Sequence, residues 1–236
     1  NTFGQFIGGK LISKKGAETI NVMNPADNST LAHIEIADKK LMNLAVKSAG
    51  EAQEKWYKSG GHSRAKVLYA LARLIQKHAR VISVLETLDN GKPIRESRDS
   101  DIPLAVRHFY YHAGWAQLQK SELKYSEPVG VVAQIIPWNF PFLMLAWKIS
   151  PALAMGNAIV LKPAENTPLT AMFFARLCEE AGVPAGVINI INGAGETGAA
   201  LAAHPDVNKV AFTGSTAVGR AIRKSTAGQG KKLTLE

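Results

Sequence analysis

The pattern of apolar and polar positions changes near residue 129. From there on, short uninterrupted apolar runs alternate with longer segments whose apolar residues recur at helical spacing. Such uninterrupted runs are typical of parallel strands buried on both faces. The pattern predicts strands at 129–136, 158–162, 187–191, 208–213 and 232–236, and helices at 142–155, 168–182, 196–203 and 216–227. We therefore expect an α/β fold with a Rossmann-like, mostly parallel sheet, flanking helices and right-handed crossovers.

The part before residue 129 is mainly helical in pattern. Apolar residues at helical spacing predict helices at 41–56, at 64–88 in one or two pieces, and at 102–118. Gly91 and Pro93 form a stop after the second of these. Near the N-terminus, residues 6–10 and 18–22 are predicted to pair as a hairpin, followed by a turn at 24–27 and a strand at 31–36.

The stretch 134–165 carries the most informative pattern. Between Glu127 and Lys162 the only charged side chain is Lys148, so nearly all of this stretch is expected to be buried. Three prolines, Asn139 and Lys148 interrupt the apolar run, which excludes a membrane span of about 20 residues. Asn139 and the segment from Lys162 to Glu165 each follow a predicted strand. Ligands of such sheets bind outside the carboxyl ends of the strands, so chemistry is expected there.

Composition and charge narrow the class of partner. The formal net charge is +9, but the basic residues are scattered along predicted helices without a nucleic-acid-reading motif, so no nucleic acid is expected as partner. The single cysteine, Cys178, suits a reducing compartment, and residues 1–9 lack the features of a signal peptide, which predicts a cytoplasmic protein. No base or oxyanion feature adjoins Cys178 in sequence, which favours a core thiol over a nucleophile. No metal site is expected.

Two glycine clusters follow predicted strands. GAGETG at 193–198 matches G-x-G-x-x-G, but the acidic residue that a dinucleotide fingerprint places about 20 positions later is missing, so the match is weak. FTGSTAVG at 212–219 places Ser215 and Thr216 at the start of a helix. There, hydroxyl and free amide groups can bind an anion, although simple helix capping explains them equally well.

Four motifs together resemble the aldehyde dehydrogenase superfamily, in that family's order and near its spacing. They are PWNFP at 137–141, KPAENTP at 162–168, FTGST at 212–216 and LTLE at 233–236. ETLDNGKP at 86–93 and the dipeptide NP at 24–25 agree with it upstream, so the likeness covers essentially the whole chain. Residues 94–117 resemble the family-sixteen branch in particular.

The resemblance implies a nicotinamide dinucleotide as cofactor. Lys162 and Glu165 match residues that bind the adenosine ribose hydroxyls. NAD is expected over NADP, because the carboxylate of Glu165 would repel a 2′-phosphate. Ile135, Ile136 and Trp138 match the groove wall on the cofactor side. Gly195 matches a residue near the adenine, and Gly214, Ser215 and Gly219 match the loop and helix start under the pyrophosphate.

The resemblance also implies a reaction, the oxidation of an aldehyde to an acid through a cysteine thiohemiacetal and thioester. Asn139 matches the oxyanion donor, with a satisfied buried amide as the alternative. Glu236 matches the general base that activates water. Lys148 matches a lysine near the same site, with a snorkelling side chain or a buried ion pair as the alternatives.

The family nucleophile is expected beyond Glu236, because Cys178 matches no catalytic position. Residues 1–236 then form an incomplete NAD(P)-binding domain without the catalytic domain. In the family, a strand near 123–133 joins the oligomerisation region, so the full-length protein is expected to be a homo-oligomer acting on a small-molecule aldehyde. The alternative is a non-catalytic scaffold related to these enzymes. The presence of Asn139, Lys162, Glu165 and Glu236 together favours the enzyme.

Overall fold

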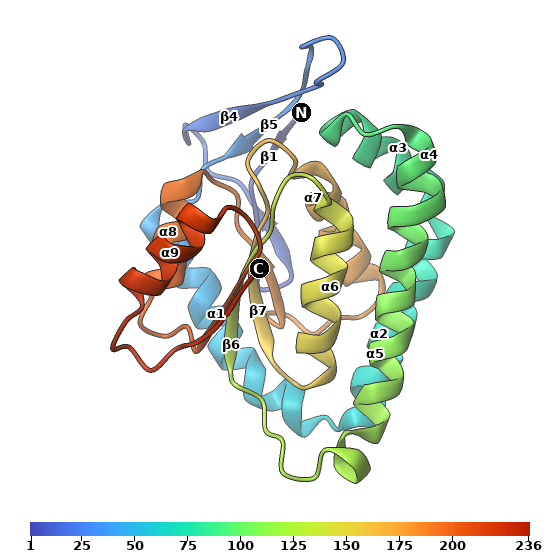
Figure 1. Ribbon diagram of the computed structural model, residues 1–236, viewed down its shortest axis with the longest axis vertical. Helices are drawn as coiled ribbons and strands as arrows, with labels where there is room; N and C mark the ends of the chain where they lie inside the picture. The colour runs from blue at the N-terminus through green and yellow to red at the C-terminus, as the bar shows by residue number, and fades with distance from the viewer.

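The structure, a computed structural model that describes residues 1–236, is built around a seven-stranded sheet in the order β10-β9-β6-β7-β8-β2-β3 (Figure 1). Five neighbouring strands run parallel, namely β6 (Val131–Ile135), β7 (Ala158–Lys162), β8 (Ile188–Ile190), β9 (Lys209–Phe212) and β10 (Lys232–Leu235). All five strands predicted from residue 129 onward are present. The predicted α/β class and mostly parallel, Rossmann-like sheet are confirmed.

Helices cover both faces of this sheet and enclose two separate cores (Figure 1). Along β7, Ile159 and Leu161 belong to one core, whereas Ala158 and Val160 belong to the other, as the two-residue period of a strand requires. The larger core packs against α6 (Pro141–Ala154), α7 (Leu169–Glu180) and helices from the first half of the chain. The smaller one packs against α1 (Lys39–Lys58), α8 (Gly195–Ala203) and α9 (Thr216–Ser225).

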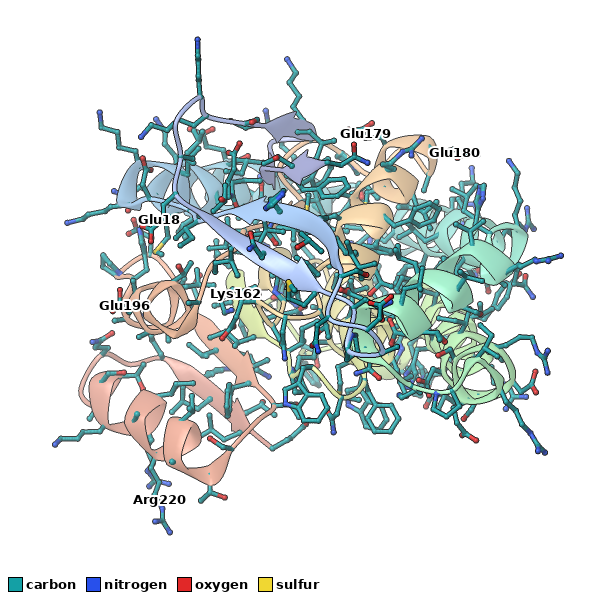
Figure 2. All side chains as sticks on the ribbon, turned by 90° about the horizontal axis from the view of Figure 1, so that it is seen from above. Glu18, Lys162, Glu179, Glu180, Glu196 and Arg220 are labelled. Atoms are coloured by element: carbon teal, nitrogen blue, oxygen red, sulfur yellow. The ribbon has the colours of Figure 1, made fainter.

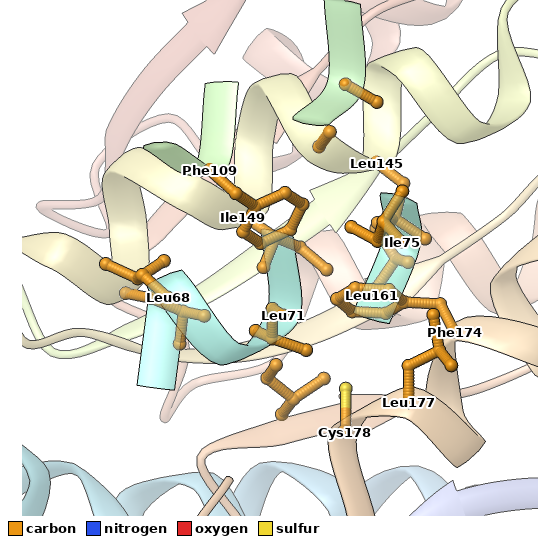
Figure 3. Close-up of a cluster of buried hydrophobic side chains, with 14 of the residues drawn as sticks. Leu68, Leu71, Ile75, Phe109, Leu145, Ile149, Leu161, Phe174, Leu177 and Cys178 are labelled. Atoms are coloured by element: carbon orange, nitrogen blue, oxygen red, sulfur yellow. The ribbon is translucent and has the colours of Figure 1, made fainter. Parts of the chain in front are cut away.

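Cys178 belongs to the larger core. Figure 3 shows its thiol pointing toward the cluster, near Leu71 and Leu177. The residue is 1% exposed, and burial raises the pKa of the thiol well above its usual value. A thiol that stays protonated is a poor nucleophile, so the prediction of a core cysteine is confirmed.

The first part of the chain supplies the predicted helices. They are α1, α2 (Gly61–Lys77), α3 (Ala79–Asn90), α4 (Ile94–Glu96), the π-helical turn η1 (Ser97–Asp101) and α5 (Ile102–Glu122). The predicted helix 64–88 is in two pieces that meet at His78. Gly91 ends α3 in the left-handed conformation with φ of 79°, which confirms the predicted stop. None of the helices combines the length and the apolar character that a membrane span requires.

The predicted pairing of residues 6–10 with 18–22 is wrong. Instead β2 (Gln5–Ile7) pairs with β3 (Lys10–Ile12), while β4 (Thr19–Met23) pairs with β5 (Thr30–Glu35) in a three-stranded sheet completed by β1 (Thr2–Phe3). Gly8 and Gly9 both have positive φ and close the first hairpin with a two-residue turn. That dipeptide is a strong hairpin signal, which favours the local pairing.

The strand expected near 123–133 begins only at Val131. Residues 123–130 form no strand, and neither sheet includes them. A strand needs a neighbour for its hydrogen bonds, and none is provided within residues 1–236. A role of this segment in oligomerisation stays a prediction.

Candidate functional site

The candidate site lies at the carboxyl ends of four adjacent parallel strands. Ile135 of β6 is level with Lys162 of β7 on one side and with Phe212 of β9 on the other, and Phe212 is level with Leu235 of β10. The segments that follow these strands therefore leave the sheet at one edge. The four motifs of the resemblance, far apart in sequence, are brought together there.

In the elbow 137–141, which follows β6, the three central residues are exposed, whereas Pro141 is buried. Trp138 is 57% and Phe140 38% exposed, and Trp147 on α6 is 45% exposed, so the expected near-complete burial of 134–165 is wrong at this edge. Asn139 is also exposed, and its side chain forms no hydrogen bond within the chain. The alternative of a satisfied buried amide is therefore wrong. The amide lies on the open end of the sheet, where it is free to donate to another molecule.

Glu236 is held beside α6 by two side chains. Its Oε2 accepts a hydrogen bond from Thr213 Oγ1 at 2.9 Å and lies 3.4 Å from Lys148 Nζ. Its backbone is also fixed, because its N–H donates to the Phe212 carbonyl at 3.0 Å and its carbonyl accepts from Gly214 N at 3.1 Å. The carboxylate nevertheless remains 43% exposed. It is thus oriented but accessible, as a base that meets water must be.

Of the alternatives for Lys148, the structure shows a buried lysine in an ion pair. Its side chain is 3% exposed, and burial lowers its pKa, with Glu236 acting in the opposite direction. Lys148 and Glu236 both line a cavity of about 370 Å³ beside α6. The ammonium of Lys148 therefore lies close enough to the Glu236 carboxylate to hold its position.

Lys162 is buried and bound by the protein itself. Its Nζ donates to the carbonyl oxygens of Gly193 and Pro163 at 2.6 and 2.8 Å, and to Glu165 Oε2 at 3.3 Å. Its side chain is 4% exposed, and burial lowers its pKa. Lys162 therefore ties the loop after β7 to the first glycine cluster, while the 45% exposed Glu165 carboxylate keeps open lone pairs. Figure 2 shows Lys162 on the same side of the molecule as Glu196 of α8 and Arg220 of α9.

The second glycine cluster forms a turn and a helix start. Ser215 is the N-cap of α9, and its Oγ accepts from Val218 N at 3.3 Å, so the capping role is real. A Cβ on Gly214 would lie 2.5 Å from the Phe212 ring, which explains the glycine by packing. Thr216 and Ala217 still have amide groups without an acceptor in the helix, because they occupy its first positions.

The other predicted cofactor residues differ in accessibility. Ile135 and Ile136 are 8% and 3% exposed and pack into the smaller and larger cores, respectively. Gly195 opens α8, and a Cβ there would meet nothing within 4 Å. A Cβ on Gly219 would approach only the Phe212 ring, at 3.8 Å. Trp138, Gly195, Gly214 and Ser215 are thus exposed, whereas Gly219 is buried.

Sequence reasoning missed Thr213 and the end of α3. Thr213 follows β9, and Glu236 follows the neighbouring strand β10, so this proximity could be inferred from the order of the parallel strands. Asn90 and Lys92 contact Trp138 and Phe140, respectively. Their motif, ETLDNGKP, was noted only as part of the resemblance, and nothing in its spacing indicates contact with a segment nearly 50 positions away.

Comparison with known proteins decides the family. The model of the aldehyde dehydrogenase family matches residues 11–236. The chain belongs to this family. It is 45% identical over 244 residues to aldehyde dehydrogenase family 2 member B4 of Arabidopsis thaliana, covering 98% of this chain and 45% of that protein. It is 44% identical over 249 residues to phenylacetaldehyde dehydrogenase of Pseudomonas fluorescens, covering 98% and 50%.

Solved structures of the family agree with the fold. An aldehyde dehydrogenase from Bacillus cereus, solved as an NAD⁺ complex, superposes with a TM-score of 0.94 at 42% identity and covers 100% of this chain and 51% of that one. The chain thus spans about half the length of the family members it matches. The narrower resemblance to the family-sixteen branch stays a prediction.

Proposed function

We propose that residues 1–236 are the cofactor-binding half of an NAD-dependent aldehyde dehydrogenase whose cysteine nucleophile lies outside this chain. One observation carries the proposal. An exposed, unpartnered amide, Asn139, and an oriented but accessible carboxylate, Glu236, lie at the same sheet edge as Lys162 and Glu165. Family membership supports aldehyde oxidation in general.

The chain's residues fit a dinucleotide. The exposed start of α9 has free amide groups at Thr216 and Ala217 and is flanked by Gly214 and Ser215, an arrangement that suits a pyrophosphate. Glu165 has a half-exposed carboxylate that can accept from ribose hydroxyls. When bound, the cofactor would accept the hydride removed from the substrate. The NAD⁺ bound by the Bacillus cereus relative supports the same choice here.

The discrimination against NADP is assigned to Glu165. Lys162 could in principle attract a 2′-phosphate, but its ammonium already donates to two carbonyl oxygens and is nearly inaccessible. The negative charge of Glu165, in contrast, is accessible and would face the phosphate. Like charges opposed in a binding groove cost several kcal/mol. We therefore assign NAD as the cofactor.

The two catalytic roles follow from the two side chains. As the cysteine thiolate attacks the aldehyde carbon, charge develops on the carbonyl oxygen, and the Asn139 amide N–H would donate to it. Once the adduct has lost its hydride to the cofactor and become a thioester, Glu236 would take a proton from water, whose oxygen attacks the thioester carbonyl and releases the acid and the thiol. Lys148 and Thr213 would hold the Glu236 carboxylate in its orientation for this step.

The test uses this chain joined to the half that carries the cysteine, here called the assembled enzyme. We expect NADH formation from small aldehydes, slowed about 100- to 1,000-fold by Asn139→Ala. The alternative, a non-catalytic scaffold, requires no turnover in the assembled protein even when NAD binds. Calorimetric NAD binding without aldehyde-dependent NADH formation would therefore favour the scaffold.

Three further parts of the proposal concern the setting. The substrate is a small-molecule aldehyde, with no nucleic acid or membrane as partner. The full-length protein is a homo-oligomer, in which the irregular segment 123–130 can gain a neighbouring strand. Size measurement of the assembled enzyme by light scattering tests the oligomer. The single buried cysteine suits the cytoplasm, which imaging of the tagged protein tests.

A further inference from the structure

Three side chains from the end of α3 and just after it contact the elbow that carries Asn139 or the residue directly after that elbow. Glu86 and Asn90 belong to α3, and Lys92 follows it. We propose that these are positioning residues, which fix the elbow 137–141 and thereby the location of the Asn139 amide. The inference rests on the proposed function of Asn139. In Figure 1 the end of α3 and the start of α6, which follows the elbow, both lie toward the top of the molecule.

Two hydrogen bonds fix the backbone on both sides of Asn139. Asn90 Nδ2 donates to the carbonyl oxygen of Trp138, the residue directly before Asn139. Glu86 Oε1 accepts from the N–H of Phe142 at 3.1 Å, in the first turn of α6. Glu86 is completely buried, so this acceptor is held in place by its surroundings. The backbone of the elbow is therefore bonded to α3 before and after the amide.

Lys92 holds the residue that follows Asn139. Its Nζ lies 3.7 Å from the centroid of the Phe140 ring and 2.5 Å from Asp101 Oδ2. The Lys92 and Asp101 side chains are only 13% and 3% exposed, which reduces screening of both interactions by solvent. An ammonium over an aromatic face is attracted to it, so the exposed Phe140 ring is anchored to the interior through this pair.

The elbow needs such support because its own side chains provide little. Trp138 and Phe140 are exposed, and both they and residues from 90–101 line an open cavity of about 640 Å³. Asn139 has no hydrogen bond of its own that would orient it. Its position is therefore set by its neighbours' backbone. A displacement of about 1 Å in a catalytic group can cost about 100-fold in rate.

The test is a double-mutant cycle in the assembled enzyme, with Asn90→Ala, Asn139→Ala and the double variant. Asn90 is partly exposed at a helix end, so its truncation is expected to leave the fold intact. We expect Asn90→Ala to lower kcat about tenfold with little change in aldehyde KM or NAD affinity. The double variant should be no slower than Asn139→Ala alone, because groups that act through one another are not additive.

The matched control is Asn43→Ala, an exposed asparagine on α1 whose side chain contacts His204 at 3.2 Å, and it should leave kcat unchanged. A normal kcat in Asn90→Ala, alongside a slow Asn139→Ala, would overturn the positioning role but leave the proposed function standing. Effects of the two substitutions that multiply would overturn it as well. An unchanged rate in Asn139→Ala would overturn both assignments.

Glu86 provides a second variant that keeps the cycle informative. Glu86→Gln preserves a carbonyl acceptor for Phe142 N and should keep most of the activity, whereas Glu86→Leu removes the acceptor and should reduce kcat. A Glu86→Leu enzyme that folds, as shown by its circular dichroism, and retains full kcat would overturn the role of Glu86.

Discussion

At the scale of single residues, the buried lysines and the half-exposed carboxylates of the site have different roles. The side chains of Lys162 and Lys148 are each nearly inaccessible to solvent, and their ammonium groups bind partners within the protein. Their carboxylate partners, Glu165 and Glu236, remain nearly half exposed. The lysines thus organise the site, and the carboxylates are the groups that can meet a ligand or water.

Replacing Glu165 tests how the cofactor is selected. We expect wild type to bind NAD more tightly than NADP, and Glu165→Gln to raise NADP affinity about tenfold or more by removing a repulsion of about 1.4 kcal/mol or greater. Calorimetric titration of both dinucleotides measures this, with Glu180→Gln on α7 as a remote control. Equal wild-type affinities, or no gain for NADP in the variant, would remove Glu165 from this role.

At the scale of elements, α3 connects the site to the core by capping two helices. Besides Glu86, which accepts from Phe142 N in the first turn of α6, Asp89 Oδ2 accepts from Leu169 N at the start of α7 at 2.8 Å. Burial raises the pKa of Glu86 to about 7 and that of Asp89 to about 8. One helix therefore places two buried acids at the ends of two others.

These raised pKa values make the caps sensitive to pH. Between an unfolded value near 4.5 and the folded value of about 7, native Glu86 holds more protons than unfolded Glu86, so its contribution to the free energy of unfolding falls as pH rises. Relative to wild type, Glu86→Gln should become more stable from pH 5 to pH 8. The difference between the two proteins is the quantity to use, because His108 and His112, with lowered pKa values, act in the opposite direction.

Urea unfolding of wild type and Glu86→Gln at the two pH values measures this difference. Glu96→Gln, an exposed acid on α4, is the control and should track wild type at both pH values. A constant stability difference between wild type and Glu86→Gln would show that Glu86 titrates alike in the folded and unfolded chain.

The elements of the second half could be predicted because short, largely apolar strands alternate there with segments of helical spacing. The strands of the parallel sheet are largely apolar, and the position of their carboxyl ends follows from that assignment alone. The first hairpin is harder to predict, because residues 10–12 and 18–22 both have strand-like patterns and only the Gly8-Gly9 turn selects the nearer partner for residues 5–7. The contacts of Asn90 and Lys92 with the elbow depend on tertiary packing, which no local pattern encodes.

At the scale of the whole molecule, the chain contains both the proposed oxyanion donor and the proposed base. Its only cysteine is buried in the core, and burial raises the pKa of the thiol. The proposed cofactor groove, in contrast, is formed by parts that all lie within residues 1–236. They are the carboxyl ends of the parallel strands, the loops that follow them and the start of α9. Cofactor binding should therefore be measurable in this chain without aldehyde oxidation.

We expect residues 1–236 alone to bind NAD but to show no aldehyde-oxidising activity. Calorimetry and NADH formation with a panel of aldehydes measure the two properties on the same sample. Cys178→Ala is the control for the thiol and should change neither. Turnover by the chain alone that survives Cys178→Ala would contradict the placement of the nucleophile.

The central claim, that Asn139 serves the first half of the reaction and Glu236 the second, is tested most directly by the first turnover of the assembled enzyme. Rapid-mixing measurement of NADH should show an undiminished burst in Glu236→Gln, followed by a stalled steady state, because hydride transfer precedes the step that needs the base. In Asn139→Ala the burst itself should slow about 100- to 1,000-fold. Loss of the burst in Glu236→Gln with cofactor binding intact, or a normal burst in Asn139→Ala, would contradict the account.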